Sequence, residues 1–324
     1  MSTPVHAPGS CYEVFASVLP MQYALGLHQL HPIDPAFVTP EFSRDFAKAA
    51  EAAGFGAVFF TEHPMPGDDW LATGGHDALD PFVALAFAAA ATSTLRVLTN
   101  LTVLPYRNPF LLAKSVATLD RLSGGRVILG VGTGYLDTEY EALGVDFEVR
   151  NERFDECLEL CRAAWTGKTV RHEGKHFSAP GNTALPTPVQ DPVPVWVGGN
   201  STLSLRRVAQ RAQGWMPMPN PRSLGNRRRS AHLETLDDLA RLLEKLRALR
   251  DEAGRGGEPL DVAFFNLLPG PGTEKFDPDA YFAEEERQRA LGVTWQIVNA
   301  TAGSPNEALD MIAAFGREVI DAPR

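Results

Sequence analysis

The sequence predicts an α/β fold, a (β/α)8 TIM barrel with insertions in the βα loops. Eight short apolar runs alternate with longer helical patterns, the runs are hydrophobic almost throughout, and the alternation fills a chain of 324 residues. Strands buried on both faces are typical of parallel sheets covered by helices, and roughly 250 residues is a typical barrel length. A doubly wound open sheet is the alternative, but no glycine fingerprint follows the first strand.

The predicted strands are runs rich in β-branched and aromatic residues. They cover 22–27, 57–61, 96–104, 126–131, 194–197, 215–218, 261–268 and 294–299. The predicted helices follow them, and two begin at clear caps, since Asp80 precedes Pro81 and Asn108 precedes Pro109. They cover 41–53, 81–92, 109–122, 151–165, 201–213, 234–253, 279–291 and 304–319.

Two stretches interrupt this rhythm and are expected at the ends of the barrel. Residues 168–192 are rich in Pro and Gly and predict a hairpin near 176–178, and residues 219–233 form a long loop. No linker divides the chain. We therefore expect a single TIM-barrel catalytic domain over residues 21–324, preceded by a disordered N-terminal extension over residues 1–20.

Composition excludes several classes of partner. Lys and Arg number 30 against 40 Asp and Glu, a net charge of −10, which argues against a nucleic-acid groove or a polybasic membrane surface. The longest apolar run, 82–91, is far shorter than the roughly 20 residues that span a membrane. Cys157 and Cys161 are expected to be core thiols of a cytoplasmic protein. His28 and His31 lack further ligands at metal-site spacing, so no metal is expected.

The candidate chemistry lies where predicted strands end, because TIM-barrel active sites are built from the βα loops. His63 follows Glu62 at the end of the second strand. A histidine there can transfer a proton near neutral pH, although a loop histidine bonded to backbone is the alternative. Motifs for a serine nucleophile or a phosphate-binding Walker loop are absent from the sequence.

Two glycine clusters also stand at strand ends. Gly198, Gly199 and Asn200 lead from the fifth strand into a helix N-terminus, which suits a phosphate or a plain tight turn. Gly132 and Gly134 alternate after the fourth strand, where they leave room for a flat ring or for close packing of the barrel.

The run NLTVLPYRNPFLLAKSVATLDRLSGGRVILGVGTGY, residues 100–135, resembles the bacterial luciferase-like superfamily of flavin- and deazaflavin-dependent oxidoreductases. Residues 54–63, 143–167 and 193–201 match as well. The chain looks most similar to the coenzyme F420-dependent branch, with FMN-dependent monooxygenases as relatives. The resemblance implies a homodimeric barrel of the luciferase-like type, a flavin-type ring across the barrel mouth, and a cofactor phosphate near the loops after strands five and six.

Site residues follow from the resemblance position by position. Glu62 and His63 match an acidic–histidine pair beside the reactive ring, which implies that they are catalytic. The implied cofactor-binding residues are Asn100 and Leu101, at a bulge with a non-proline cis peptide, and Thr102, Gly132, Thr133, Gly134, Tyr135, Gly198, Gly199 and Asn200. In one departure, Tyr135 stands where some sugar-phosphate-oxidising relatives carry a glutamate.

The resemblance implies an oxidoreductase that transfers a hydride between coenzyme F420 and a small organic substrate. His63 would donate the proton or anchor developing charge, and Glu62 would orient His63 or contact the cofactor ring. One alternative is an FMN-dependent monooxygenase supplied by a separate reductase. Another is a flavin-binding protein without turnover. Arginines 222, 227, 228 and 229 crowd one loop, where they either pair with the charged tail of the deazaflavin or balance local acids.

Overall fold

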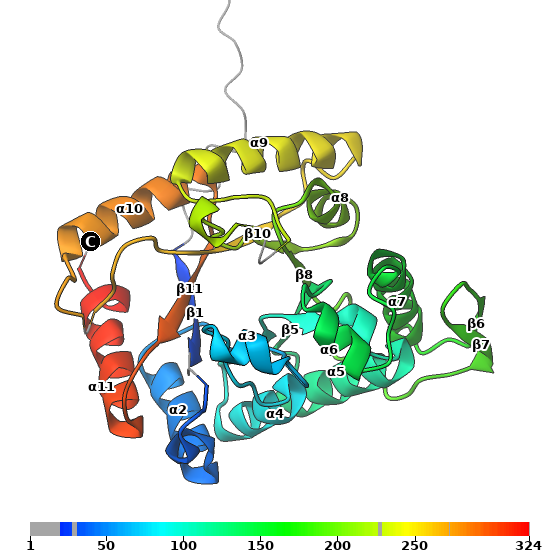
Figure 1. Cartoon of the computed structure of the whole chain (residues 1–324), viewed down its shortest axis with the longest axis horizontal. Coiled ribbons are helices and arrows are strands. Elements are labelled where there is room, and N and C mark those ends of the chain that lie inside the picture. Colours follow the sequence, from blue (N-terminus) through cyan, green and yellow to red (C-terminus); the bar gives the residue numbers. More distant parts are fainter. Residues whose placement is uncertain (1–19, 28–30, 226–228, 272, 324) are drawn as a thin grey trace, which may run out of the picture.

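The computed structural model describes residues 20–27, 31–225, 229–271 and 273–323. Within them, eight parallel strands close into a barrel (Figure 1), as the sequence predicts. Around the ring they are β1 (Gln22–Leu27), β2 (Ala57–Phe60), β3 (Arg96–Thr99) continued by β4 (Thr102–Val103), β5 (Val127–Gly132), β8 (Val195–Gly198), β9 (Gly214–Met216), β10 (Asp261–Phe265) and β11 (Trp295–Ala300). Pairing of β1 with β11 and of β3 with β5 closes the ring.

Helices follow the strands and surround the barrel. The longer ones are α2 (Pro40–Ala52), α4 (Pro81–Ala91), α5 (Pro109–Ser123), α7 (Arg150–Trp165), α8 (Thr202–Arg211), α9 (Leu236–Glu252), α10 (Pro278–Leu291) and α11 (Pro305–Phe315). Both predicted caps are confirmed, because Asp80 accepts from the N–H of Phe82 and Asn108 accepts from the N–H of Phe110. Each cap satisfies a donor that the first helical turn leaves unpaired.

Several predicted boundaries are wrong because short elements carry little periodicity. The strand expected over 96–104 breaks at Asn100–Leu101, whose peptide bond is cis. The strand expected over 261–268 ends at Phe265, and the helix expected over 201–213 ends at Arg211. The structure adds α3 (Asp68–Ala72), α6 (Asp137–Ala142) and the single turns η1 (Pro35–Val38), η2 (Leu104–Tyr106), η3 (Arg222–Leu224) and η4 (Gly316–Ile320). The extension predicted for residues 1–20 lies, except for Pro20, outside the described residues.

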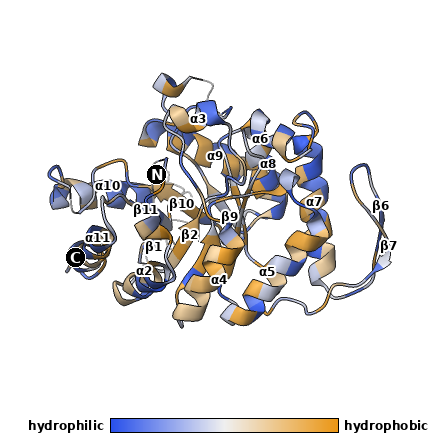
Figure 2. Cartoon of the chain, turned by 60° about the horizontal axis from the view of Figure 1, so that its bottom comes forward, coloured by the Kyte–Doolittle hydropathy of each residue, from blue (hydrophilic) through white to orange (hydrophobic). Residues whose placement is uncertain are grey.

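The interior of the barrel is a packed core. Trp196 and Trp295 meet edge to face with ring centroids 5.4 Å apart, and Phe59, Leu98 and Ile128 pack around them. A second apolar layer lies between the strands and the helices and includes the buried Cys157 and Cys161 of α7. Figure 2 shows hydrophobic residues concentrated on the strands and on α4. In the described part of the chain, no helix is both long and apolar enough to cross a membrane.

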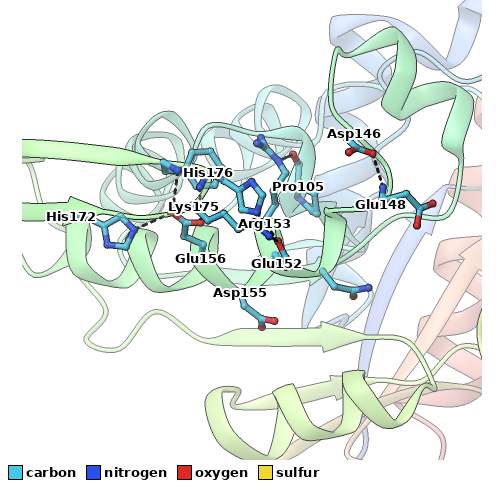
Figure 3. Close-up of polar contacts among 12 residues, drawn as sticks. Pro105, Asp146, Glu148, Glu152, Arg153, Asp155, Glu156, His172, Lys175 and His176 are labelled. Carbon is cyan, nitrogen blue, oxygen red and sulfur yellow. Dashed lines mark hydrogen bonds and ion pairs between the residues drawn. The ribbon is translucent and has the colours of Figure 1, made fainter.

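The hairpin expected within residues 168–192 is confirmed as β6 (Val170–Glu173) and β7 (Ser178–Asn182). It lies in the connection from α7 to β8, and the 219–233 insertion follows β9 at the other end of the barrel. Glu156 on α7 accepts from the N–H of His176 and of Phe177, both at 3.0 Å, and meets Nε2 of His172 at 3.0 Å (Figure 3). The hairpin is therefore held against α7.

Candidate active site at the mouth of the barrel

His63 lies at the mouth of the barrel, just beyond the C-terminal end of β2, with its side chain 12% exposed. Its Nδ1 is 3.3 Å from Oε2 of Glu139. The ring lies 4.5 Å from Trp70 and 5.0 Å from His76, with Tyr135 at 6.3 Å, measured between centroids. A histidine held at Nδ1 by a carboxylate keeps Nε2 for proton transfer.

Glu139, on α6, is the functional residue that the sequence reasoning missed. Its carboxylate is almost fully buried, and it accepts from the N–H of Met65 at 3.1 Å and from the hydroxyl of Tyr106 at 2.9 Å, besides meeting His63. Burial first, and then the nearby Glu139 charge, raise the pKa of Tyr106 far above its ordinary value, so its hydroxyl stays a donor. The only sequence signal was an acid in the loop after strand four.

The expectation that Glu62 orients His63 is wrong. Successive side chains along an extended segment point to opposite sides, and Glu62 turns away from His63. Its buried carboxylate accepts from the N–H of Val103 at 2.5 Å and from Nε of Arg107 at 2.7 Å. Burial raises the pKa of Glu62, against the opposing effect of Arg107. Glu62 thus anchors the segment after β4.

Leu101 lies at the centre of the predicted ring site. The cis bond between Asn100 and Leu101 is confirmed. A Cβ at residue 132 would lie 2.6 Å from Cδ1 of Leu101, and a Cβ at residue 198 would lie 2.3 Å from its Cδ2. Gly132 and Gly198 therefore make room for Leu101. For Gly132, this supports close packing of the barrel over room for a flat ring.

The remaining residues that are predicted to contact the cofactor ring differ in their exposure. Thr133, Gly134 and Tyr135 are partly exposed at the end of β5, and the hydroxyl of Tyr140 donates to the carbonyl of Thr133. Thr102 is fully buried, and its hydroxyl has no partner among the described residues. Thr102 therefore has no surface exposed to a cofactor in this structure, and its role in binding stays a prediction.

The predicted phosphate turn is tied to the loop after β9. Gly199 has a φ of 100°, which favours glycine. Asn200 donates from Nδ2 to the carbonyls of Met218 and Ala231, and its N–H donates to Oγ of Ser230 at 3.1 Å. The amide of Asn200 thus supports the loop. What remains for an anion is the first turn of α8, where Oγ of Ser201 accepts from the N–H of Ser204 at 3.1 Å and the N–H groups of Thr202 and Leu203 have no carbonyl partner within the helix.

These residues fit a flat, anionic cofactor. Leu101 provides a partly exposed apolar side chain at the strand ends, and His63, Trp70 and Tyr135 form a ring cluster at the mouth. The start of α8 offers N–H donors for a phosphate. Histidine, aromatic side chains and an anion site at one barrel end suit redox chemistry on a bound cofactor.

Comparison with known proteins gives three findings. A family model described as luciferase-like monooxygenase matches residues 21–268. Uncharacterized protein Rv0940c of Mycobacterium tuberculosis is 36% identical over 233 residues, 68% of this chain and 75% of that protein. F420-dependent glucose-6-phosphate dehydrogenase of Nakamurella multipartita is 31% identical over 228 residues, 68% of this chain and 60% of that protein.

Among solved structures, monooxygenase RslO1 from Streptomyces bottropensis is similar in fold. Its TM-score is 0.75 at 23% sequence identity, and the match covers 93% of this chain and 99% of that chain. At this level of identity the likeness extends to the fold.

Proposed function

Because the chain belongs to the luciferase-like monooxygenase family, we propose that it is an oxidoreductase that transfers a hydride between coenzyme F420 and a small organic substrate at the barrel mouth. The observation that carries the proposal is the half-buried His63, held at Nδ1 by Glu139 and flanked by Trp70 and Tyr135. A relative named as an F420-dependent dehydrogenase supports the choice of cofactor.

The chain's own residues manage the proton and the binding. When bound, the deazaflavin ring supplies the hydride donor or acceptor. His63 gives or takes the accompanying proton at Nε2, and Glu139 keeps the imidazole ring oriented. Leu101 supports the flat ring, and the first turn of α8 receives the phosphate.

The composition of the arginine loop is our reason for preferring F420 to FMN, although the described Arg222 and Arg229 pair with Glu234 and Asp137. The described part of this loop contacts the proposed phosphate turn, since Ser230 accepts from the N–H of Asn200. Arg229 reaches Asp137 of α6 at 2.8 Å, and Arg227 and Arg228 lie outside the described residues. The deazaflavin coenzyme carries a polyglutamate tail, so basic residues beside its phosphate would favour it over FMN, which ends at one phosphate.

A spectroscopic titration of the purified chain with F420 and with FMN tests the proposal. We expect F420 to bind and FMN to bind more weakly, with the preference reduced by salt. Replacing Arg227, Arg228 and Arg229 together by Ser should weaken F420 binding by about 3- to 100-fold and leave FMN binding nearly unchanged. Tight binding of FMN with no binding of F420 would instead support the monooxygenase alternative.

Glu139→Gln tests the role of the buried acid, because it keeps the size of the side chain and removes its charge. We expect the turnover number to fall by about 10- to 100-fold while the Michaelis constant stays within about twofold. A larger Michaelis constant with unchanged turnover would mean that Glu139 acts in binding rather than through His63.

We also propose that the chain forms a homodimer through α4 and α5. Val83 and Phe87 lie one turn apart on α4 and are 61% and 47% exposed, and Leu111 and Leu122 of α5 are 71% and 78% exposed. Apolar side chains gathered on adjacent helices favour association. Val83→Asp with Phe87→Asp should convert the dimer to a monomer in sedimentation, and a monomeric unmodified chain would refute the proposal.

A further inference from the structure

A second concave site lies at the base of the barrel, the end opposite the mouth. It is a groove of about 550 Å³, lined by the ends of α7 and α8 and by residues that precede β8, β9 and β10. This volume falls in the usual range of sites for small molecules. Its wall combines Trp165, Pro188 and Val193 with basic side chains.

Positive charge dominates this groove although the whole chain is acidic. Arg162, Lys168, Arg211 and Arg255 line it, with Asp191 as the acid among the described lining residues. Neither Arg162 nor Lys168 forms an ion pair within the described part of the chain, and Arg211 approaches Asp155 at 3.8 Å.

The guanidinium groups also act on one another. Burial first, and then the charges of Arg211 and Arg255, lower the pKa of Arg162. This repulsion is the effect expected where cations share a groove without a matching anion.

Backbone carbonyls position two of these cations, and of the two only Arg255 also has a carboxylate partner among the ion pairs of the described residues. Arg255 donates from Nη1 to the carbonyl of Ala209 at 3.1 Å and from Nη2 to that of Ala212 at 3.0 Å, and its Nε bonds to Glu258. Arg162 donates to the carbonyl of Arg211 at the end of α8. A carbonyl is a dipole, so this bond positions the Arg162 guanidinium and leaves most of its charge, and part of its five N–H donors, to the groove. The charge of Arg255 is compensated by Glu258.

We propose that this groove binds a small polyanion of the diphosphate class, held by Arg162, Lys168 and Arg211. Guanidinium groups match phosphate oxygens in geometry and charge, and Trp165 with Val193 offers an apolar wall for an organic portion of the ligand. The groove shares no residue with the mouth, so the proposal is independent of the oxidoreductase activity.

Calorimetric titration of the full chain with pyrophosphate at low ionic strength tests this site. The variant Lys168→Gln with Arg211→Gln removes two cations whose side chains do not hold the backbone carbonyls. Its matched control is Lys48→Gln with Arg206→Gln, which makes the same charge change at exposed positions of α2 and α8 outside the groove. Circular dichroism checks that both variants fold.

We expect pyrophosphate to bind the unmodified chain saturably with one site per chain. The groove variant should weaken binding by about 2- to 30-fold, and the control by less than about twofold. The proposal is overturned if binding is not saturable, or if the groove variant and the control lose affinity equally. A loss confined to the groove variant supports it, whichever cofactor the mouth binds.

Discussion

The mouth and the base of this barrel hold their charged groups in different ways. At the mouth, the buried Glu62 and Glu139 are held largely by side chains and N–H groups from separate loops. At the base, Glu51 of α2 accepts from three consecutive N–H groups of one turn, those of Ser93, Thr94 and Leu95. Charge at the mouth therefore depends on the packing of several separate segments, and the charge of Glu51 at the base on one backbone turn.

Arginines at the base follow from the direction of the helices. In a barrel of βα units each helix returns toward the base, so its unpaired C-terminal carbonyls gather there. Arg126 donates to the carbonyls of Ala89, Leu95 and Ser123 at 2.6 to 2.8 Å. Arg255 does the same at the end of α8. This contrast predicts that changes at the mouth affect turnover, whereas changes to these backbone-bonded groups at the base affect stability and leave turnover unchanged.

His63→Ala should give the largest effect. It removes the proposed proton-transfer group, and turnover should fall by about 10²- to 10⁴-fold. The melting temperature should change little, because His63 follows the end of β2 and is not part of the hydrophobic core. His172→Ala, on the hairpin, is the matched control and should keep full activity. If turnover of the His63 variant fell less than about threefold, His63 would not handle the proton.

Arg107→Ala should test whether residues at the mouth also contribute to the free energy of unfolding. Arg107 contacts both Glu62 and Asp80, and its loss leaves the Glu62 carboxylate buried without its cation, at a cost of about 3–5 kcal/mol. Burial already raises the pKa of Glu62, so the folded variant holds a proton that the unfolded chain releases. The stability that this variant loses should therefore increase as the pH rises from the pKa of Glu62 in the unfolded chain to its raised pKa in the folded chain. Denaturant unfolding at several pH values would measure this loss.

The double variant Glu62→Gln with Arg107→Ala supplies the control for this ion pair. It removes the buried charge together with its partner, so it should be more stable than Arg107→Ala alone at neutral pH. Equal stability of the two variants would show that the arginine contributes by packing on Phe82, which its guanidinium covers at 4.9 Å, and not by charge.

Glu51→Gln should test the base. Burial acts to raise the pKa of Glu51, but the backbone hydrogen bonds outweigh it and lower the pKa from 4.5 to about 2. Because solvent screens this partly exposed group, we expect a loss of about 1–2 kcal/mol in unfolding free energy and unchanged turnover. The contribution should be full above pH 4.5 and disappear as the pH falls toward about 2. Glu41→Gln on the same helix is the control, and a similar loss there would contradict the role of the turn.

Glu156→Gln should give the smallest effect. Burial favours the neutral acid, but bonds from His172 and from the hairpin backbone prevail and lower the pKa of Glu156. The stability that Glu156 contributes is therefore fully present above the ordinary pKa of a glutamate. It is lost as the pH falls through the lowered pKa of the folded protein. We expect at most about 1 kcal/mol, seen as faster amide exchange in β6 and β7 alone. Faster exchange across α7 as well would mean that the hairpin and the helix open together.

The sequence predicted most of the barrel because its signals are local. The caps at Asp80 and Asn108 and the continuous apolar runs are each readable within a few residues. The site was less predictable because it depends on contacts between distant segments. His63 was found at a strand end, but its carboxylate partner, Glu139, lies 76 residues away on a six-residue helix. Periodicity carries no information about such a pair.

The packing of Leu101 against Gly132 and Gly198 has an evolutionary consequence. Three strands share one volume, so their residues at this point are not free to change separately. A Cβ on either glycine would force the Leu101 side chain to move or favour a smaller residue at position 101, and a smaller residue at 101 alone leaves a cavity. Amino-acid substitutions at positions 101, 132 and 198 should therefore be correlated among homologues. A homologue with a smaller residue at position 101 could carry alanine at position 132 or 198. The shape of its barrel mouth would then differ while the rest of the barrel stayed the same.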